Sequence, residues 1–157
     1  MTELMDHDNA DVALAAVELI NELTDPEALE AGDEAGTKAL VDGLVENAAL
    51  ELLVRFLAKL SEEEDDQRQG VYNILSIFEN LSELQPKALE ALCANTDLVE
   101  WLFKRLKAKA FDQNKAYASE VLSILVHGSE LTQRQVGGNE GMDRLLGVRM
   151  ALSICVP

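Results

Sequence analysis

Apolar side chains recur at spacings of three and four residues along most of this chain, as they do on one face of an α-helix. Every apolar pattern in the chain has this period, and Leu and Ala dominate its composition, so the sequence predicts an all-α protein. Two stripes carry the pattern most clearly: Leu50, Leu53, Val54, Leu57 and Leu60, and then Val71, Ile74, Leu75, Phe78 and Leu81.

Residues that favour helix ends divide the pattern into segments. Asn9 or Asp11 can cap a first helix that runs to about residue 23, and Asp25 followed by Pro26 favours the start of a short helix. The two glycines and two acids of residues 31–36 predict a loop. Further helices are predicted at about residues 37–46, 48–60, 62–81, 85–94, 98–106 and 114–127.

Three details of these helices can be tested directly. Ser61 and Glu64 fit a capping box, in which each side chain bonds a free backbone N–H at the start of the next helix. Gly128 is predicted to end the last helix as a left-handed residue. In the first helix, the apolar residues expected to point inward are Val12, Ala16, Leu19, Ile20 and Leu23. In the helix at 98–106, they are Leu98, Trp101, Leu102 and Leu106.

The helical segments also repeat. Residues 50–57 align with 99–106 at an offset of 49, residues 75–78 with 122–125 at 47, and residues 19–23 with 77–81 at 58. A helical period near ~40–47 residues is typical of HEAT and armadillo solenoids. Because each unit holds a short, a middle and a long helix, we expect an armadillo-like α-solenoid of about three partial repeats over residues 1–148, followed by an atypical tail at 149–157.

The repeats align polar residues on the long third helices, which should line the concave groove of the solenoid. Asn73, Ser76 and Asn80 share one helix face because they are three and four residues apart. They align with Ala15, Glu18 and Glu22 in the preceding unit, and with Glu120, Ser123 and His127 in the following one. These polar positions are candidates for partner binding, and a plainly solvated helix face explains the same pattern equally well.

Charge narrows the class of partner. The net charge at pH 7 is −16, with acids concentrated at residues 22–34 and 62–66 and one local basic patch at residues 104–109. An acidic surface repels nucleic acid and anionic lipid and attracts Lys- and Arg-rich peptides. The chain contains no run of 18 or more apolar residues, so a membrane span is not predicted. The N-terminus does not have the pattern of a signal peptide. The two cysteines are too few for a disulfide framework.

Four segments resemble the beta-catenin-like protein 1 family: LMDHDNADV at residues 4–12, ELTD at 22–25, WLFKRLKAK at 101–109 and SEVLSIL at 119–125. The resemblance runs from residue 4 to about 148 and implies a nuclear armadillo scaffold associated with the spliceosome in pre-mRNA splicing. It also implies binding to a Cdc5-like component of the Prp19-related complex and recognition of basic nuclear-localisation segments; vertebrate members also bind an antibody-diversifying cytidine deaminase.

The chain departs from the family pattern in several places. The family's proteins are several times longer and carry a basic N-terminal extension, and residues 149–157 do not follow the family pattern, as expected of a truncated gene model or a read-through intron. Where importin-like repeats carry an asparagine that grips basic peptides, this chain has Ile77 and Ile124. Any recognition of basic segments should therefore depend on acidic residues. The alternative to a splicing scaffold is a nuclear-import-type adaptor that reads basic localisation signals.

No residue set predicts an enzyme, a cofactor or a metal site. His7 between Asp6 and Asp8 could suggest a metal-dependent enzyme, but a zinc site needs three or four ligands, and a helix-capping turn explains the same residues. Cys93 lies in a short apolar helix and is expected to be a buried small hydrophobe. The glycine-rich run at residues 137–141 lacks the Gly-Lys-Ser/Thr ending of a phosphate-binding loop.

Overall fold

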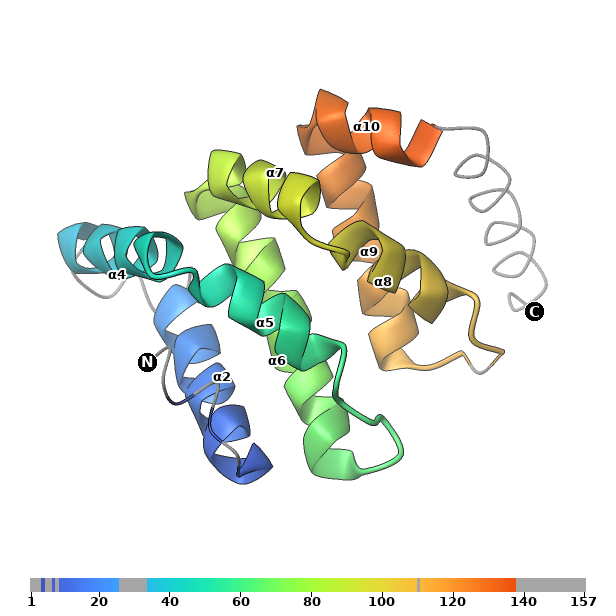
Figure 1. The fold of residues 1–157 in the computed structure, drawn as a ribbon, viewed down its shortest axis with the longest axis horizontal. Helices are drawn as coiled ribbons and strands as arrows, with labels where there is room; N and C mark the ends of the chain where they lie inside the picture. Colours follow the sequence, from blue (N-terminus) through green and yellow to red (C-terminus); the bar gives the residue numbers. More distant parts are fainter. Residues whose placement is uncertain (1–3, 5–6, 8, 26–33, 110, 138–157) are drawn as a thin grey trace.

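The computed structural model describes residues 4, 7, 9–25, 34–109 and 111–137, and this part of the chain is helical with no strand. The long helices α2, α6 and α9 lie side by side, and shorter helices cross them on one side (Figure 1). The helices are α2 (Ala10–Thr24), α4 (Glu34–Glu46), α5 (Ala49–Leu57), α6 (Asp65–Leu84), α7 (Pro86–Asn95), α8 (Leu98–Leu106), α9 (Gln113–Gly128) and α10 (Glu130–Gly137).

The described residues hold two complete three-helix units, α4–α5–α6 and α7–α8–α9, so the predicted order of helices within a unit is confirmed. Helix α2 occupies the place of a preceding third helix, and α10 follows α9 as the first helix of a further unit. The sequence pattern did not predict α10. The short helix expected after Pro26, the boundary at residue 148 and the tail at 149–157 lie outside the described residues.

Helix α2 begins where the sequence predicts. Asn9 is the capping residue, and its side-chain oxygen accepts a hydrogen bond from the backbone N–H of Asp11 at 2.8 Å. The predicted inward face is partly wrong, because Leu19 and Leu23 are 46% and 41% exposed. Helix α2 packs chiefly on α6, and it does so through small or β-branched residues that allow a close approach: Ala13, Ala16, Val17, Ile20 and Thr24.

The middle helices α5 and α8 bury matching stripes. Leu50, Leu53, Val54 and Leu57 are buried as predicted, and Leu98, Leu102 and Leu106 are buried in α8. Trp101 is only partly buried at the edge of the core, which corrects the expectation that it anchors the middle helix. Val99 and Phe103 of the same helix are buried instead.

Helix α6 is the centre of the molecule, since it packs on α2 along one side and on α9 along the other. All five residues of its predicted stripe are buried, and Ile77 is buried as well. The predicted capping box is wrong: the helix begins at Asp65, and Ser61 instead donates its backbone N–H to Gln67 Oε1 at 2.8 Å. The acidic run before α6 is therefore shaped by residues that follow it in the helix.

Two other predicted helix ends also differ from the structure. Gly128 is the last residue of α9, and no described glycine has a positive φ, because the chain continues through an extended Ser129 directly into α10. Helix α4 begins at Glu34, inside the predicted loop. Asp112 caps α9 by accepting from the Lys115 backbone N–H at 2.9 Å, where the sequence placed a helix start.

Candidate partner-binding groove

Each of the third helices α2, α6 and α9 has a line of residues along one of its faces. The repeat alignment places these three lines on the same side of the solenoid. Their positions follow the alternating three- and four-residue spacing of a single helix face. The lines are Asp11, Ala15, Glu18 and Glu22 on α2; Asp66, Gln69, Asn73, Ser76 and Asn80 on α6; and Gln113, Ala116, Glu120, Ser123 and His127 on α9. All eight residues singled out from the sequence lie on these lines.

The exposure of these residues differs between the helices. Those on α2 and α9 are mostly exposed, whereas Asn73 and Asn80 on α6 are 8% and 9% exposed. Helix α6 lies between its two neighbours, so their side chains close over it. In the candidate groove, the central line therefore corresponds to the floor, and the lines on α2 and α9 correspond to its two sides.

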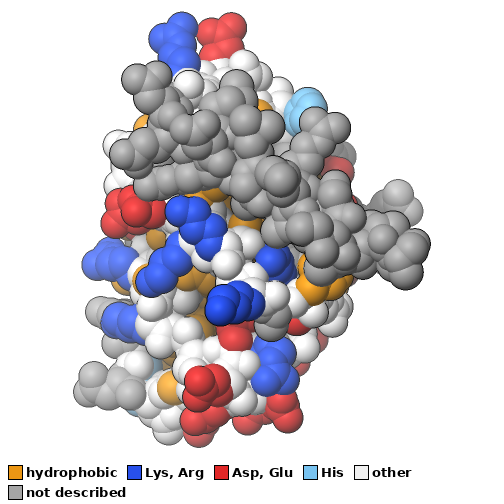
Figure 2. Space-filling model, turned by 90° about the vertical axis from the view of Figure 1, so that its right-hand side faces the viewer, with side chains coloured by type: hydrophobic (Ala, Val, Ile, Leu, Met, Phe, Trp, Pro, Cys, Tyr) orange, Lys and Arg blue, Asp and Glu red, His pale blue; other side chains and the backbone are white. Residues whose placement is uncertain are grey.

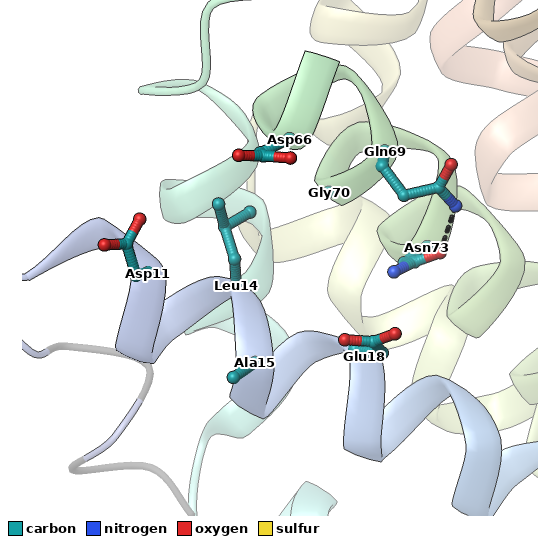
Figure 3. Close-up of a pocket in the computed structure, with 8 residues that line it drawn as sticks. All are labelled: Asp11, Leu14, Ala15, Glu18, Asp66, Gln69, Gly70 and Asn73. Carbon is teal, nitrogen blue, oxygen red and sulfur yellow. Dashed lines mark hydrogen bonds between the residues drawn. The ribbon is translucent and has the colours of Figure 1, made fainter. Parts of the chain in front are cut away.

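The two asparagines on the floor are not equivalent. Asn80 donates from Nδ2 to the buried Thr24 Oγ1 at 3.4 Å, so its amide nitrogen ties α6 to α2. Asn73 Oδ1 accepts from Gln69 Nε2 at 2.9 Å, which leaves the amide nitrogen of Asn73 facing the space between α2 and α6 (Figure 3). Asn73 is thus better placed than Asn80 to bond a ligand.

The carboxylates along the groove are not neutralised by nearby cations. Glu18, Glu22 and Glu120 take part in none of the ion pairs formed among the described residues. Glu63 and Glu64, in the turn before α6, likewise form no ion pair there. A cationic partner could approach the groove without first displacing a residue of this chain.

Between α2 and α6 the groove holds a pocket of about 400 Å³ (Figure 3). A close helix contact shapes it: a Cβ on Gly70 would lie 2.3 Å from Leu14 Cδ2, so glycine allows Leu14 to sit against α6. The pocket is lined by Asp11, Leu14, Ala15, Glu18, Asp66, Gln69, Gly70 and Asn73.

Sequence reasoning missed most of this pocket, although the repeat alignment reaches it. Subtracting the offset of 58 from Gln69 leads to Asp11, so extending the aligned face by one turn would have included both residues. Asp66 lies a further turn toward the start of α6. The contact of Leu14 with Gly70 has no signal in the repeat pattern, because it depends on how closely α2 and α6 approach.

On the side of α9, His127 bonds its own helix, and Tyr117, which is not on the groove line, bonds α6. The Nδ1 of His127 lies 2.7 Å from the Ser123 carbonyl oxygen one turn earlier. Tyr117 donates its hydroxyl to the Glu79 carboxylate on α6. Burial raises the pKa of Tyr117 above its usual value, and the hydrogen bond to Glu79 adds to the rise.

His7 and Cys93, the other residues considered as reactive groups, have structural roles in the fold. His7 Nδ1 accepts from the Asn9 backbone N–H at 3.0 Å, in the turn that leads into α2. The described residues contain no group of three or more His, Cys, Asp or Glu side chains able to hold a metal ion. Cys93 is buried as predicted, and burial raises the pKa of its thiol to about 11. No helix in the described part is long and apolar enough to cross a membrane.

The basic patch predicted at residues 104–109 lies at the far end of the stack. Lys104, Lys107 and Lys109 are exposed, and Figure 2, which views that end, shows Lys and Arg side chains gathered there. Arg105 is only 10% exposed because its Nη2 donates to Glu62 at 3.0 Å and to Asp112 at 2.5 Å. The groove and the basic patch therefore occupy different parts of the surface.

Comparison with known proteins identifies the family. The profile of the family described as "Catenin-beta-like, Arm-motif containing nuclear" matches residues 1–152. The chain belongs to the catenin-beta-like family. The family description confirms the armadillo-type fold predicted from the repeats, and it describes the family as nuclear.

The relatives extend this membership across distant eukaryotes. Beta-catenin-like protein 1 of Homo sapiens is 42% identical over 147 residues, which covers 91% of this chain and 25% of that protein. The Rattus norvegicus protein is 42% identical over 144 residues, and the Schizosaccharomyces pombe homolog is 34% identical over 146 residues. The chain thus spans about a quarter of the length of these relatives, and it is a catenin-beta-like segment with the architecture of a protein-binding armadillo scaffold.

Proposed function

We propose that this chain is a nuclear protein-binding module that holds a basic segment of a splicing partner in the groove formed by α2, α6 and α9. The resemblance to the beta-catenin-like family suggests a Cdc5-like component of the Prp19-related complex as that partner, and pre-mRNA splicing as the process. The module acts by binding, so its contribution is to bring a partner to an assembly.

The observation that carries this proposal is a row of exposed carboxylates on matching faces of the third helices. None of these carboxylates forms an ion pair among the described residues. Glu18 and Glu22 lie on α2 and Glu120 on α9, on either side of a polar floor on α6. The net charge of −16 extends the attraction beyond these contacts. Lys- and Arg-rich segments are therefore the partners that this surface fits best.

An extended peptide across three parallel helices would meet an acid at each side and a polar side chain at the floor. Each contact with an exposed carboxylate is weak, of order 0–1 kcal/mol, so affinity has to come from several contacts made together. Such contacts act mainly on the association rate and on partner choice. They weaken as salt shortens the range of the interaction.

The test is a titration of a Lys- and Arg-rich peptide from the Cdc5-like protein at low and at moderate salt. The Glu18→Lys/Glu22→Lys variant should bind more weakly than the parent and should melt at a similar temperature, because both residues are exposed. The matched control is Glu63→Lys/Glu64→Lys, which makes the same change in net charge in the turn before α6 and should have a smaller effect.

The groove assignment fails if the control variant loses binding while the Glu18/Glu22 variant keeps it. In that case the acidic turn before α6 is the binding site. Co-precipitation of the Cdc5-like protein from nuclear extract, detected with a specific antibody, tests the identity of the partner separately.

A further inference from the structure

We propose that the pocket between α2 and α6 is a subsite for a single arginine side chain of the bound segment. This inference depends on the proposed function, because it assumes that a basic segment lies along the third-helix groove. It adds a position and a side-chain preference: the arginine would enter the pocket between Asp11, Glu18 and Asp66.

The charge of the pocket fits an organic cation. Asp11 and Glu18 project from α2 and Asp66 from α6, and none of the three forms an ion pair among the described residues. These carboxylates do not form a group that could hold a metal ion in the described part of the chain. Carboxylates that surround a space without converging on one point suit a cation that is spread over several atoms.

The shape of the pocket fits a long side chain with an apolar stem. Its volume of about 400 Å³ lies within the range of small-ligand cavities, about 300–1,000 Å³. Leu14 and Ala15 line the α2 side and provide an apolar surface for methylene groups. Gly70 keeps the opposite wall free of a side chain and allows the close approach of Leu14 already described.

Asn73 is independent evidence for a ligand. It is 8% exposed, and its Oδ1 is held by Gln69, so the amide is oriented with its nitrogen toward the pocket (Figure 3). That nitrogen has no hydrogen-bond partner among the described residues. This nitrogen is accessible from the groove, and a peptide carbonyl passing over the floor would accept a hydrogen bond from it.

Arginine fits this arrangement better than lysine for a geometric reason. The guanidinium group is planar and presents five N–H donors in different directions, whereas the lysine ammonium concentrates its donors on one atom. Carboxylates that come from two separate helices can each reach a different edge of a guanidinium. The same carboxylates cannot all come close to one ammonium nitrogen.

The test uses two kinds of synthetic peptide with the same basic sequence, one all-lysine and one with a single arginine placed in turn at each position. At one position, arginine should improve affinity for the parent protein about fivefold. Asp11→Asn/Asp66→Asn should remove this preference. Glu120→Gln on α9 is the matched control, and it should weaken both peptides to the same extent and keep the preference.

A second variant separates shape from charge. Ala15 is exposed and lines the pocket, so Ala15→Phe should fill the pocket, leave every carboxylate in place and abolish the arginine preference. Circular dichroism melts establish that each variant is folded. The arginine subsite alone would be overturned if the all-lysine peptide and every single-arginine peptide bound equally well while Glu18→Lys/Glu22→Lys still weakened binding. If neither peptide binds the parent, the proposed function and the subsite both fail.

Discussion

Two aromatic residues that look alike in the sequence differ in their contribution to stability. Phe78 is fully buried at the centre of α6, whereas Trp101 lies partly buried at the edge of α8. Truncating a side chain costs stability in proportion to the apolar surface that it had buried and to the cavity that it leaves behind. Size alone therefore ranks these two residues in the wrong order.

Phe78→Ala should lower the free energy of unfolding by about 3–5 kcal/mol, as large-to-small changes in cores do. Trp101→Ala should cost less, about 1–2 kcal/mol, because water and neighbouring side chains can fill part of the space. Urea unfolding followed by circular dichroism measures both. A larger loss for Trp101→Ala would show that α8 is rotated relative to the structure described above.

Cys93 predicts a weakening of the fold at alkaline pH. Its thiol has a pKa of about 11 in the folded protein, raised by burial from an ordinary value of 9.0. Above pH 9 the unfolded chain therefore releases this proton while the folded chain keeps it, so stability falls as pH rises. The free energy of unfolding of Cys93→Ala should decline less steeply than that of the parent between pH 9 and 11. Parallel urea titrations across that range compare the two slopes, and equal slopes would contradict a buried, neutral thiol.

At the scale of elements, one cluster of polar side chains joins consecutive units. Arg105 in α8 bonds Glu62 in the turn before α6 and Asp112 at the start of α9. Asn114 in α9 donates to Glu62 at 2.8 Å and to the Arg68 carbonyl oxygen at 3.0 Å. The first acidic residue of the run at 62–66 is therefore a structural link between units.

Arg105→Ala should lower the free energy of unfolding by about 2 kcal/mol, because it leaves Glu62 and Asp112 without their shared cation. This is below the ~3–5 kcal/mol found for fully buried pairs, since the Asp112 side chain is 39% exposed. Arg134→Ala is the control: its contact with Glu130 is long, at 3.8 Å, and exposed, so its loss should change stability little. Thermal melts of both variants against the parent test the difference, and equal effects would remove Arg105 as an inter-unit link.

At the scale of the whole molecule, charge has opposite consequences for folding and for binding. A net charge of −16 on 157 residues makes the folded chain repel itself, and salt screens that repulsion. Raising sodium chloride from about 20 mM to about 500 mM should therefore raise the melting temperature, since the Debye length falls from roughly 20 Å to about 4 Å over that range. The same change should weaken binding of a basic peptide. Scanning calorimetry and peptide titration in matched buffers measure the two trends, and a melting temperature that falls with added sodium chloride would contradict the first.

The sequence alone determined the class of fold and the register of the groove. Apolar spacing is a property of each helix by itself, so the all-α architecture and the stripes of α5 and α6 could be predicted from it. Repetition then aligned Ala15, Asn73 and Glu120 on matching faces, because repeated units place equivalent residues in equivalent positions.

Only the tertiary structure decided which of these residues are buried and where the pocket forms. Whether Leu19 or Trp101 is buried depends on which face of its helix a neighbouring helix covers. The spacing of apolar residues within one helix does not determine which face that is. The wall of the pocket likewise depends on Gly70, which lets Leu14 of another helix approach closely. Contacts between helices far apart in the chain determine burial and cavities, whereas local spacing determines only the helices and their faces.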